Sequence, residues 1–184
     1  DIKPKNLTDA EKKEVFANKS GWVREAGSVL SGNGNTGADP EVLVAISNLS
    51  ANMGAANITE IEFVTTSFDK SAGGNIDVLV RFNEPVTVTG TPRVSITNGN
   101  QGSGSGRGPH LANYLSGSTT NELTFRCTIA AANAATNADD ILVIGTNATA
   151  LNSGTIKDTG EGTVATITNT SAQGTAAGSI TVVA

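Results

Sequence analysis

The sequence has little of what catalytic and disulfide-stabilised proteins depend on. It contains one cysteine, Cys127, and one histidine, His110. A single cysteine excludes a disulfide within the chain, and a single histidine cannot by itself supply a histidine-based metal site or a catalytic triad. Serine and threonine are abundant, but no histidine base stands at a plausible position to activate one. We therefore expect no enzymatic activity, no cofactor and no metal site.

Aromatic residues and charges are also scarce. Aromatics make up 4% of the chain and charged residues 16%, so threonine, serine, asparagine and glycine must cover most of the surface. This composition is unlike that of a typical cytosolic enzyme and closer to that of an extracellular or virion protein. The net charge of −5 argues against nucleic acid or an anionic membrane as the main partner, because phosphate binding needs clustered lysine and arginine. The sequence has no apolar run of about 18 residues, so it predicts no transmembrane helix.

The first twenty residues carry a helix signal. Thr8 is followed three residues later by Glu11, which is the spacing of a capping box. The pattern predicts a helix of two or three turns that includes Val15 and Phe16 and ends between Asn18 and Gly21. Such a short helix needs a surface to pack on.

Residues 1–56 are predicted to be this helix followed, over residues 21–56, by an extended anchoring arm that contains one strand and becomes ordered only on a partner. Val42, Val44 and Ile46 alternate with other residues in the manner of a short strand. Trp22 is the only tryptophan and lies beside a glycine. We predict that Trp22, Val42, Val44 and Ile46 bind a partner; the alternative for Trp22 is that the arm folds back and this side chain caps the end of the core.

From Asn57 onward the pattern is that of a β protein. Apolar residues alternate with polar ones in several short segments separated by Gly, Asn and Asp, which predicts half-buried strands. These residues are Ile76, Val78, Val80 and Phe82, then Val94 and Ile96, then Leu123, Phe125, Cys127 and Ile129, with Ile141–Ile144 as a short apolar run. We predict an all-β fold with a β-sandwich over residues 57–184, in which Cys127 is a small buried hydrophobic residue.

The segment "FNEPVTVTGTP" (residues 82–92) holds two prolines and a glycine among β-branched residues. Pro85 has no amide hydrogen, so it must lie at a sheet edge or a bulge. Gly90 and Pro92 favour a turn before the next strand. The segment therefore predicts a strand, a kink, a short strand, a turn and a strand, and Glu84 needs no chemical role.

Three segments resemble a bacterial immunoglobulin-like repeat found in large surface and adhesion proteins. They are "VRFNEPVTVTGTPRVSI", "NYLSGSTTNELTFRCTIAA" and "ALNSGTIKD", with Tyr114, Ser116 and Gly117 in the hairpin motif and Leu151, Gly154, Ile156 and Asp158 in the last motif. The resemblance implies an immunoglobulin-like sandwich over residues 57–184. Such domains are spacers or adhesive modules, so the resemblance says little about function.

The whole chain, with its "GWVREAGSVLSGNGN" and "PEVLVAI" segments, resembles virion structural proteins of tailed phages, particularly those that infect cyanobacteria. This resemblance implies a location in the virion, most simply as a capsid decoration or cement protein. Its partners would be the major capsid protein and copies of itself. A neck or tail component is the alternative in the same class, and a cell-surface adhesin module is the alternative from another class.

Three loops could bind something. Asp69–Asn75 carries oxygen ligands around glycines but lacks the closing acid of a calcium loop, which favours a hairpin turn. Asp139, Asp140 and Asp158 could approach one another and bind a cation weakly, or could be solvated acids in turns. The glycine-rich loop 98–109 is either a flexible hairpin tip or a contact loop, which could reach a host surface.

Overall fold

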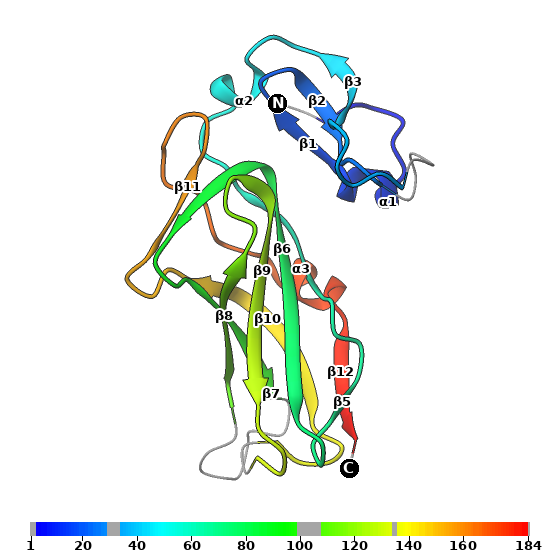
Figure 1. The fold of residues 1–184 in the computed structure, drawn as a ribbon, viewed down its shortest axis with the longest axis vertical. Helices are drawn as coiled ribbons and strands as arrows, with labels where there is room; N and C mark the ends of the chain where they lie inside the picture. Colours follow the sequence, from blue (N-terminus) through cyan, green and yellow to red (C-terminus); the bar gives the residue numbers. More distant parts are fainter. Residues whose placement is uncertain (1–2, 29–33, 99–107, 134–135, 184) are drawn as a thin grey trace.

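The computed structural model describes residues 3–28, 34–98, 108–133 and 136–183. Within them the chain forms a three-stranded sheet and a larger nine-stranded sheet. Figure 1 shows the small sheet at one end of the molecule, above the long strands of the large sheet. We call residues 3–56 the N-terminal unit and residues 57–183 the main body.

The N-terminal unit begins with helix α1 (Asp9–Lys13), whose predicted capping box is confirmed. The Thr8 hydroxyl accepts a hydrogen bond from the Glu11 amide at 3.2 Å, and the Glu11 carboxylate accepts one from the Thr8 amide at 2.8 Å. The predicted length is wrong, because the chain leaves the helix and forms strand β1 (Val15–Asn18). Val15 and Phe16 favour a strand, and pairing with the next strand decides in favour of it.

The prediction of an extended arm is also wrong. Strand β1 pairs antiparallel with β2 (Gly21–Arg24), and β2 pairs antiparallel with β3 (Glu41–Ala45). Only β3 was expected as a strand. Gly21 lets β2 and β3 approach closely, since its φ is +133° and a Cβ there would lie 2.0 Å from the Val44 carbonyl oxygen.

The N-terminal sheet has a small hydrophobic core of its own. Helix α2 (Leu49–Asn52) follows β3 and places Leu49 against the sheet. The buried side chains of this core are Val15, Ala17, Trp22 and Leu49, with Leu7, Leu43 and Met53 packed around them. A folded sheet with a core is therefore present where the sequence pattern indicated an arm that needs a partner to become ordered.

The main body is mostly β, as predicted, and its sheet folds on itself in a sandwich-like arrangement. The strands hydrogen-bond in the order β11-β6-β9-β8-β7-β10-β12-β5, and β4 pairs with β6. Helix α3 (Ser171–Ala176) lies against β10 and β4. The strand bounds are Ile58–Phe63 (β4), Phe68–Asp69 (β5), Gly74–Thr89 (β6), Arg93–Asn98 (β7), His110–Ser116 (β8), Thr120–Ile129 (β9), Ile141–Ala150 (β10), Thr155–Asp158 (β11) and Ser179–Val183 (β12).

The kink predicted at Pro85 is confirmed. The pairing of β6 with β9 shifts register between Arg81 and Val86, so Pro85 lies in a bulge where no ladder hydrogen bond is lost. Before the bulge β6 pairs with β4, and after it β6 pairs with β11. Gly90 then turns the chain into β7 with a φ of +76°.

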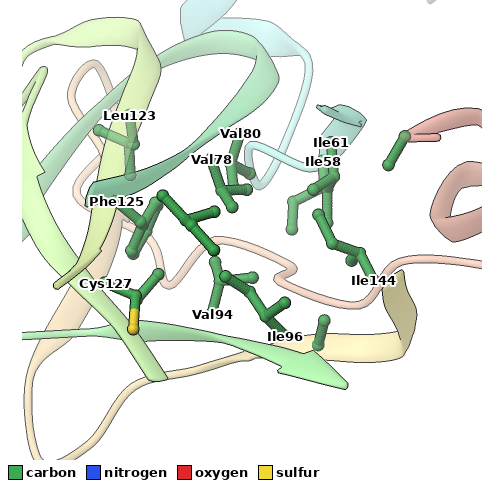
Figure 2. Packing of buried hydrophobic residues seen from close by; sticks show 14 of the residues in the cluster. Ile58, Ile61, Val78, Val80, Val94, Ile96, Leu123, Phe125, Cys127 and Ile144 are labelled. Atoms are coloured by element: carbon green, nitrogen blue, oxygen red, sulfur yellow. The ribbon is translucent and has the colours of Figure 1, made fainter. Parts of the chain in front are cut away.

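The core of the main body is made by the alternating residues that the sequence singled out. Side chains from β4, β6, β7, β9 and β10 point toward one another in Figure 2. Phe125 is fully buried and meets Tyr114 edge-on, with ring centroids 6.0 Å apart. Cys127 is 8% exposed and belongs to this core, which confirms its expected role as a small hydrophobic residue.

Candidate functional site

The first candidate site is the free edge of the N-terminal sheet. Strand β3 is the last strand in the order β1-β2-β3, so its outer backbone groups pair with no other strand in the described chain. Val42, Val44 and Ile46 are 49%, 41% and 42% exposed. An edge strand with exposed apolar side chains is a template for pairing with another chain. We call Glu41–Ile46 the β3 edge.

The structure separates Trp22 from the β3 edge. Trp22 is 3% exposed and packs with Val15, Ala17 and Leu49 inside the N-terminal unit. It neither projects toward a partner nor caps the core of the main body, since the two hydrophobic cores share no residue. The sequence did not reveal this third arrangement, in which Trp22 is buried inside the N-terminal unit. Its partners lie on β1 and α2, and neither the strand β1 nor the helix α2 was predicted.

An arginine of the main body, Arg81, lies at the contact with the N-terminal unit. The Arg81 guanidinium donates to Glu60 at 2.9 Å, to Glu62 at 2.6 Å and to Glu122 at 2.6 Å. Glu25, from the N-terminal unit, lies 3.9 Å from the same guanidinium. Arg81 therefore balances the charge of a group of acids from both parts of the chain.

Among these acids, Glu25 has a strongly raised pKa. Burial raises the pKa of Glu25 to about 7; the Asn121 amide, which donates to it at 3.0 Å, and Arg81 oppose this effect, and the neighbouring Glu122 adds to it. Lys13, also from the N-terminal unit, pairs with Glu60 at 2.6 Å. We call this contact around Arg81, Glu25 and Lys13 the junction. It is polar, and its stability is expected to depend on pH.

A second carboxyl group lies in the bulge of β6. Glu84 is 0% exposed, and its Oε1 accepts a hydrogen bond from Asn83 Nδ2 at 3.3 Å. The Asp158 carboxyl lies close enough to Glu84 to act on its acidity, since Asp158 pairs with Val86 on the neighbouring strand. Burial, and next to it the Asp158 charge, raises the pKa of Glu84 to about 7. We call Glu84 and Asp158 the carboxyl pair; sequence reasoning missed Glu84, since nothing in its local pattern signals a partner 74 residues away.

The three acids predicted as a possible cation site do not come together. Asp140 is buried at the end of the main body that holds the C-terminus, where it accepts hydrogen bonds from Asn98 Nδ2 at 2.6 Å and Asn137 N at 2.8 Å. Asp158 ends β11, on the side of the N-terminal unit (Figure 1). Neither is a solvated turn acid. Among the residues that the structure describes, no group of three or more His, Cys, Asp or Glu side chains is arranged to hold a metal ion.

The remaining predicted loops offer no site that can be described. Asp69 accepts hydrogen bonds from the Ser71 hydroxyl and amide, as an ordinary turn residue does. Most of loop 98–109 lies outside the described residues. His110, at the end of that loop, is buried against Thr136, with which it shares a hydrogen bond of 3.0 Å.

Comparisons of the chain with protein-family models, with curated proteins and with solved structures found no match. None of the helices in the described ranges is long and apolar enough to cross a membrane. Function must therefore be argued from the β3 edge, the junction and the carboxyl pair.

Proposed function

We propose that this chain is a non-enzymatic virion structural protein that binds the outer capsid of a tailed phage through its N-terminal unit, as a decoration or cement protein. Its main body is then an immunoglobulin-like domain exposed on the particle. The observation that carries the proposal is the β3 edge, whose outer side pairs with no other strand in the described chain and which carries three exposed apolar side chains.

The β3 edge fits attachment by strand addition. In this mode a strand of the partner pairs with the exposed backbone, and apolar side chains fill pockets beside it. An uncovered edge of this kind favours aggregation, so a partner that covers it removes a liability. The main body extends away from the N-terminal unit (Figure 1), which suits a protein held at one end and exposed at the other.

The surface of the main body supports the same role. The chain is poor in charge and rich in threonine, asparagine and glycine, which suits a coat that does not bind nucleic acid. The partner of the β3 edge is the major capsid protein in this proposal, and copies of the same chain are the alternative partner. His110 and Cys127 are both buried in the main body, which supports a non-enzymatic role.

The test is attachment of the purified protein to capsids that lack it. Val42→Lys with Val44→Lys places two charges on the β3 edge, where exposed side chains tolerate them in the free protein. We expect loss of attachment with an unchanged melting temperature. The matched control replaces Val64 and Val164 by lysine, since these valines are 55% and 60% exposed on the main body. Normal attachment of the β3 variant would refute the proposal.

The location of the protein distinguishes a decoration protein from the two alternative functions, a neck or tail component and a cell-surface adhesin. A neck or tail component would occupy a ring at one vertex of the virion, whereas a decoration protein is distributed over the shell. Immunogold labelling of whole particles separates the two. A cell-surface adhesin would instead be absent from particles and would bind host cells, and the β3 lysine variant would leave that binding intact if the loops of the main body carry it.

A further inference from the structure

The carboxyl pair has two oxygens that the protein does not satisfy. Glu84 Oε2 and Asp158 Oδ2 are both buried, and neither accepts a hydrogen bond from any donor in the described chain. Glu84 is 0% exposed and Asp158 is 2% exposed, so water does not reach these atoms freely. A buried carboxylate oxygen without a partner is costly, and the cost is removed by a proton or by a cation.

The surroundings hold Asp158 in place but leave one of its oxygens free. Asp158 Oδ1 accepts hydrogen bonds from the amides of Gly160 at 2.6 Å and Glu161 at 3.0 Å, which fixes the carboxylate plane. Asp158 also lines a hollow of about 190 Å³ between the two parts of the chain. The lining residues include Ser50, a buried side chain of the N-terminal unit, and Pro85 from the bulge of β6.

Within the part of the chain that the structure describes, the charged groups that act most on Glu84 are acidic. The groups that act most on Glu84 are Asp158, Asn83 and Glu161, of which two are acidic and none is basic. Lys19 lines the hollow, yet it is not among these groups. This differs from the junction at Arg81, where a guanidinium sits among the acids. The pair therefore carries uncompensated negative charge whenever both groups are ionised.

We propose that Glu84 and Asp158 bind a divalent cation, Ca²⁺, beside this hollow, which Asp158 and Ser50 line and which Glu84 adjoins through Pro85. The available ligands are all oxygens, which suits Ca²⁺ and excludes the softer metals that prefer cysteine or histidine. Only two charged ligands are present, so binding is weak, with a Kd on the order of 10⁻⁴–10⁻³ M, as in extracellular calcium modules.

The proposed site joins the two parts of the chain. Glu84 lies in the bulge of β6. The neighbouring residue Asn83 connects this bulge to the start of the main body, because its Oδ1 accepts a hydrogen bond from the Asn57 amide at 2.7 Å. Ser50 belongs to α2 of the N-terminal unit. A cation here would neutralise the carboxyl pair and stiffen the connection between the N-terminal unit and the main body. This inference does not depend on the proposed role in the virion.

The test is a thermal melt of the metal-free protein at about pH 8, where Glu84, whose pKa is raised to about 7, has mostly lost the proton that would compete with the cation. Adding CaCl₂ to about 10 mM should raise the melting temperature by roughly 3–10 °C, given the expected Kd. Glu84→Gln should abolish this rise, since its amide can donate to Asp158 and satisfies the pair without a cation. Asp69→Asn, which changes an exposed turn acid, should keep the full rise.

Titration calorimetry of the unsubstituted protein provides a second measurement that needs no variant. We expect one Ca²⁺ per chain at about pH 8 and clearly weaker binding near pH 5.5, where Glu84 holds a proton. The absence of a calcium-dependent rise at pH 8 would overturn the proposal and leave the pair as a shared-proton contact. An equal rise in the melting temperature of Glu84→Gln would show that the salt only screens surface charge. An equal rise when MgCl₂ replaces CaCl₂, in both the unsubstituted protein and Glu84→Gln, would show the same. Either result would also overturn the proposal.

Discussion

Replacing Arg81 by glutamine should loosen the contact between the N-terminal unit and the main body. The Arg81 guanidinium is hydrogen-bonded to Glu60, Glu62 and Glu122 and lies 3.9 Å from Glu25. Glutamine keeps most of the aliphatic length but removes the charge. The group of four acids then loses the guanidinium, and Lys13, which pairs with Glu60 at 2.6 Å, offsets only part of the remaining repulsion.

The magnitude follows from the burial of the side chains. Removing one partner of a buried ion pair costs about 3–5 kcal/mol, because the other charge is left uncompensated. The Arg81 side chain is 15% exposed, and its carboxylate partners are 13–33% exposed, so solvent screens part of the effect. We expect a loss of about 2–3 kcal/mol in the free energy of unfolding at neutral pH.

A matched control lies on the neighbouring strand. Arg126 donates twice to Asp77, both at 2.7 Å, but its side chain is 39% exposed and it has this single acidic partner. Arg126→Gln should therefore cost no more than about 1 kcal/mol.

Urea unfolding with two probes is the assay. Trp22 is the only tryptophan and lies in the N-terminal unit, so its fluorescence reports on that unit, while far-ultraviolet circular dichroism reports mainly on the main body. In Arg81→Gln the fluorescence transition should move to lower urea than the dichroism transition, and the difference should shrink near pH 5, where Glu25, whose pKa is raised to about 7, holds a proton. Coincident transitions with a loss no larger than that of Arg126→Gln would refute the reasoning.

Three further changes test other parts of the fold. Phe125→Ala should lower the free energy of unfolding by about 3–5 kcal/mol in a denaturant titration, since Phe125 is fully buried in the main core. Trp22→Ala should speed amide hydrogen exchange in β1 and β2 and leave the main body protected, because Trp22 belongs to the hydrophobic core of the N-terminal unit. Glu25 has a pKa raised to about 7, so its folded form retains a proton that the unfolded chain loses above about pH 4.5. Stability should thus fall as pH rises from about 5 to 7, and Glu25→Gln should flatten this slope in melts at several pH values.

The strands of the main body could be predicted because their signal is local. Strict alternation over Ile76–Phe82 and Leu123–Ile129 puts one face of each strand in the core whatever the rest of the chain does. The bulge at Pro85 was predictable for the same reason, since a missing amide hydrogen constrains the sheet at that residue alone.

The N-terminal sheet could not be predicted in this way. Strands β1 and β2 are four residues each, and all of Val15–Ala17 and Gly21–Val23 is buried, so no alternation marks either strand. Their pairing partner β3 follows only after a glycine- and asparagine-rich segment. The capping box correctly located the start of α1. No local signal marks the end of the helix before Val15, because the change to a strand depends on pairing with β2.

The junction and the carboxyl pair could not be predicted from the sequence, because each depends on acids that only folding brings together. Each acid there is unremarkable alone, and Glu84 looks like part of a structural bulge. Folding brings Glu84 beside Asp158 and Glu25 beside Glu122, and in both cases burial raises the pKa of one acid to about 7. One cluster contains Arg81, whereas no basic side chain is among the described groups that act most on Glu84 in the other. Since the same chain balances one group of acids with a guanidinium, the lack of such a group at the carboxyl pair points to a proton or a metal ion as the missing partner, and the pH and calcium dependence of stability decide between the two.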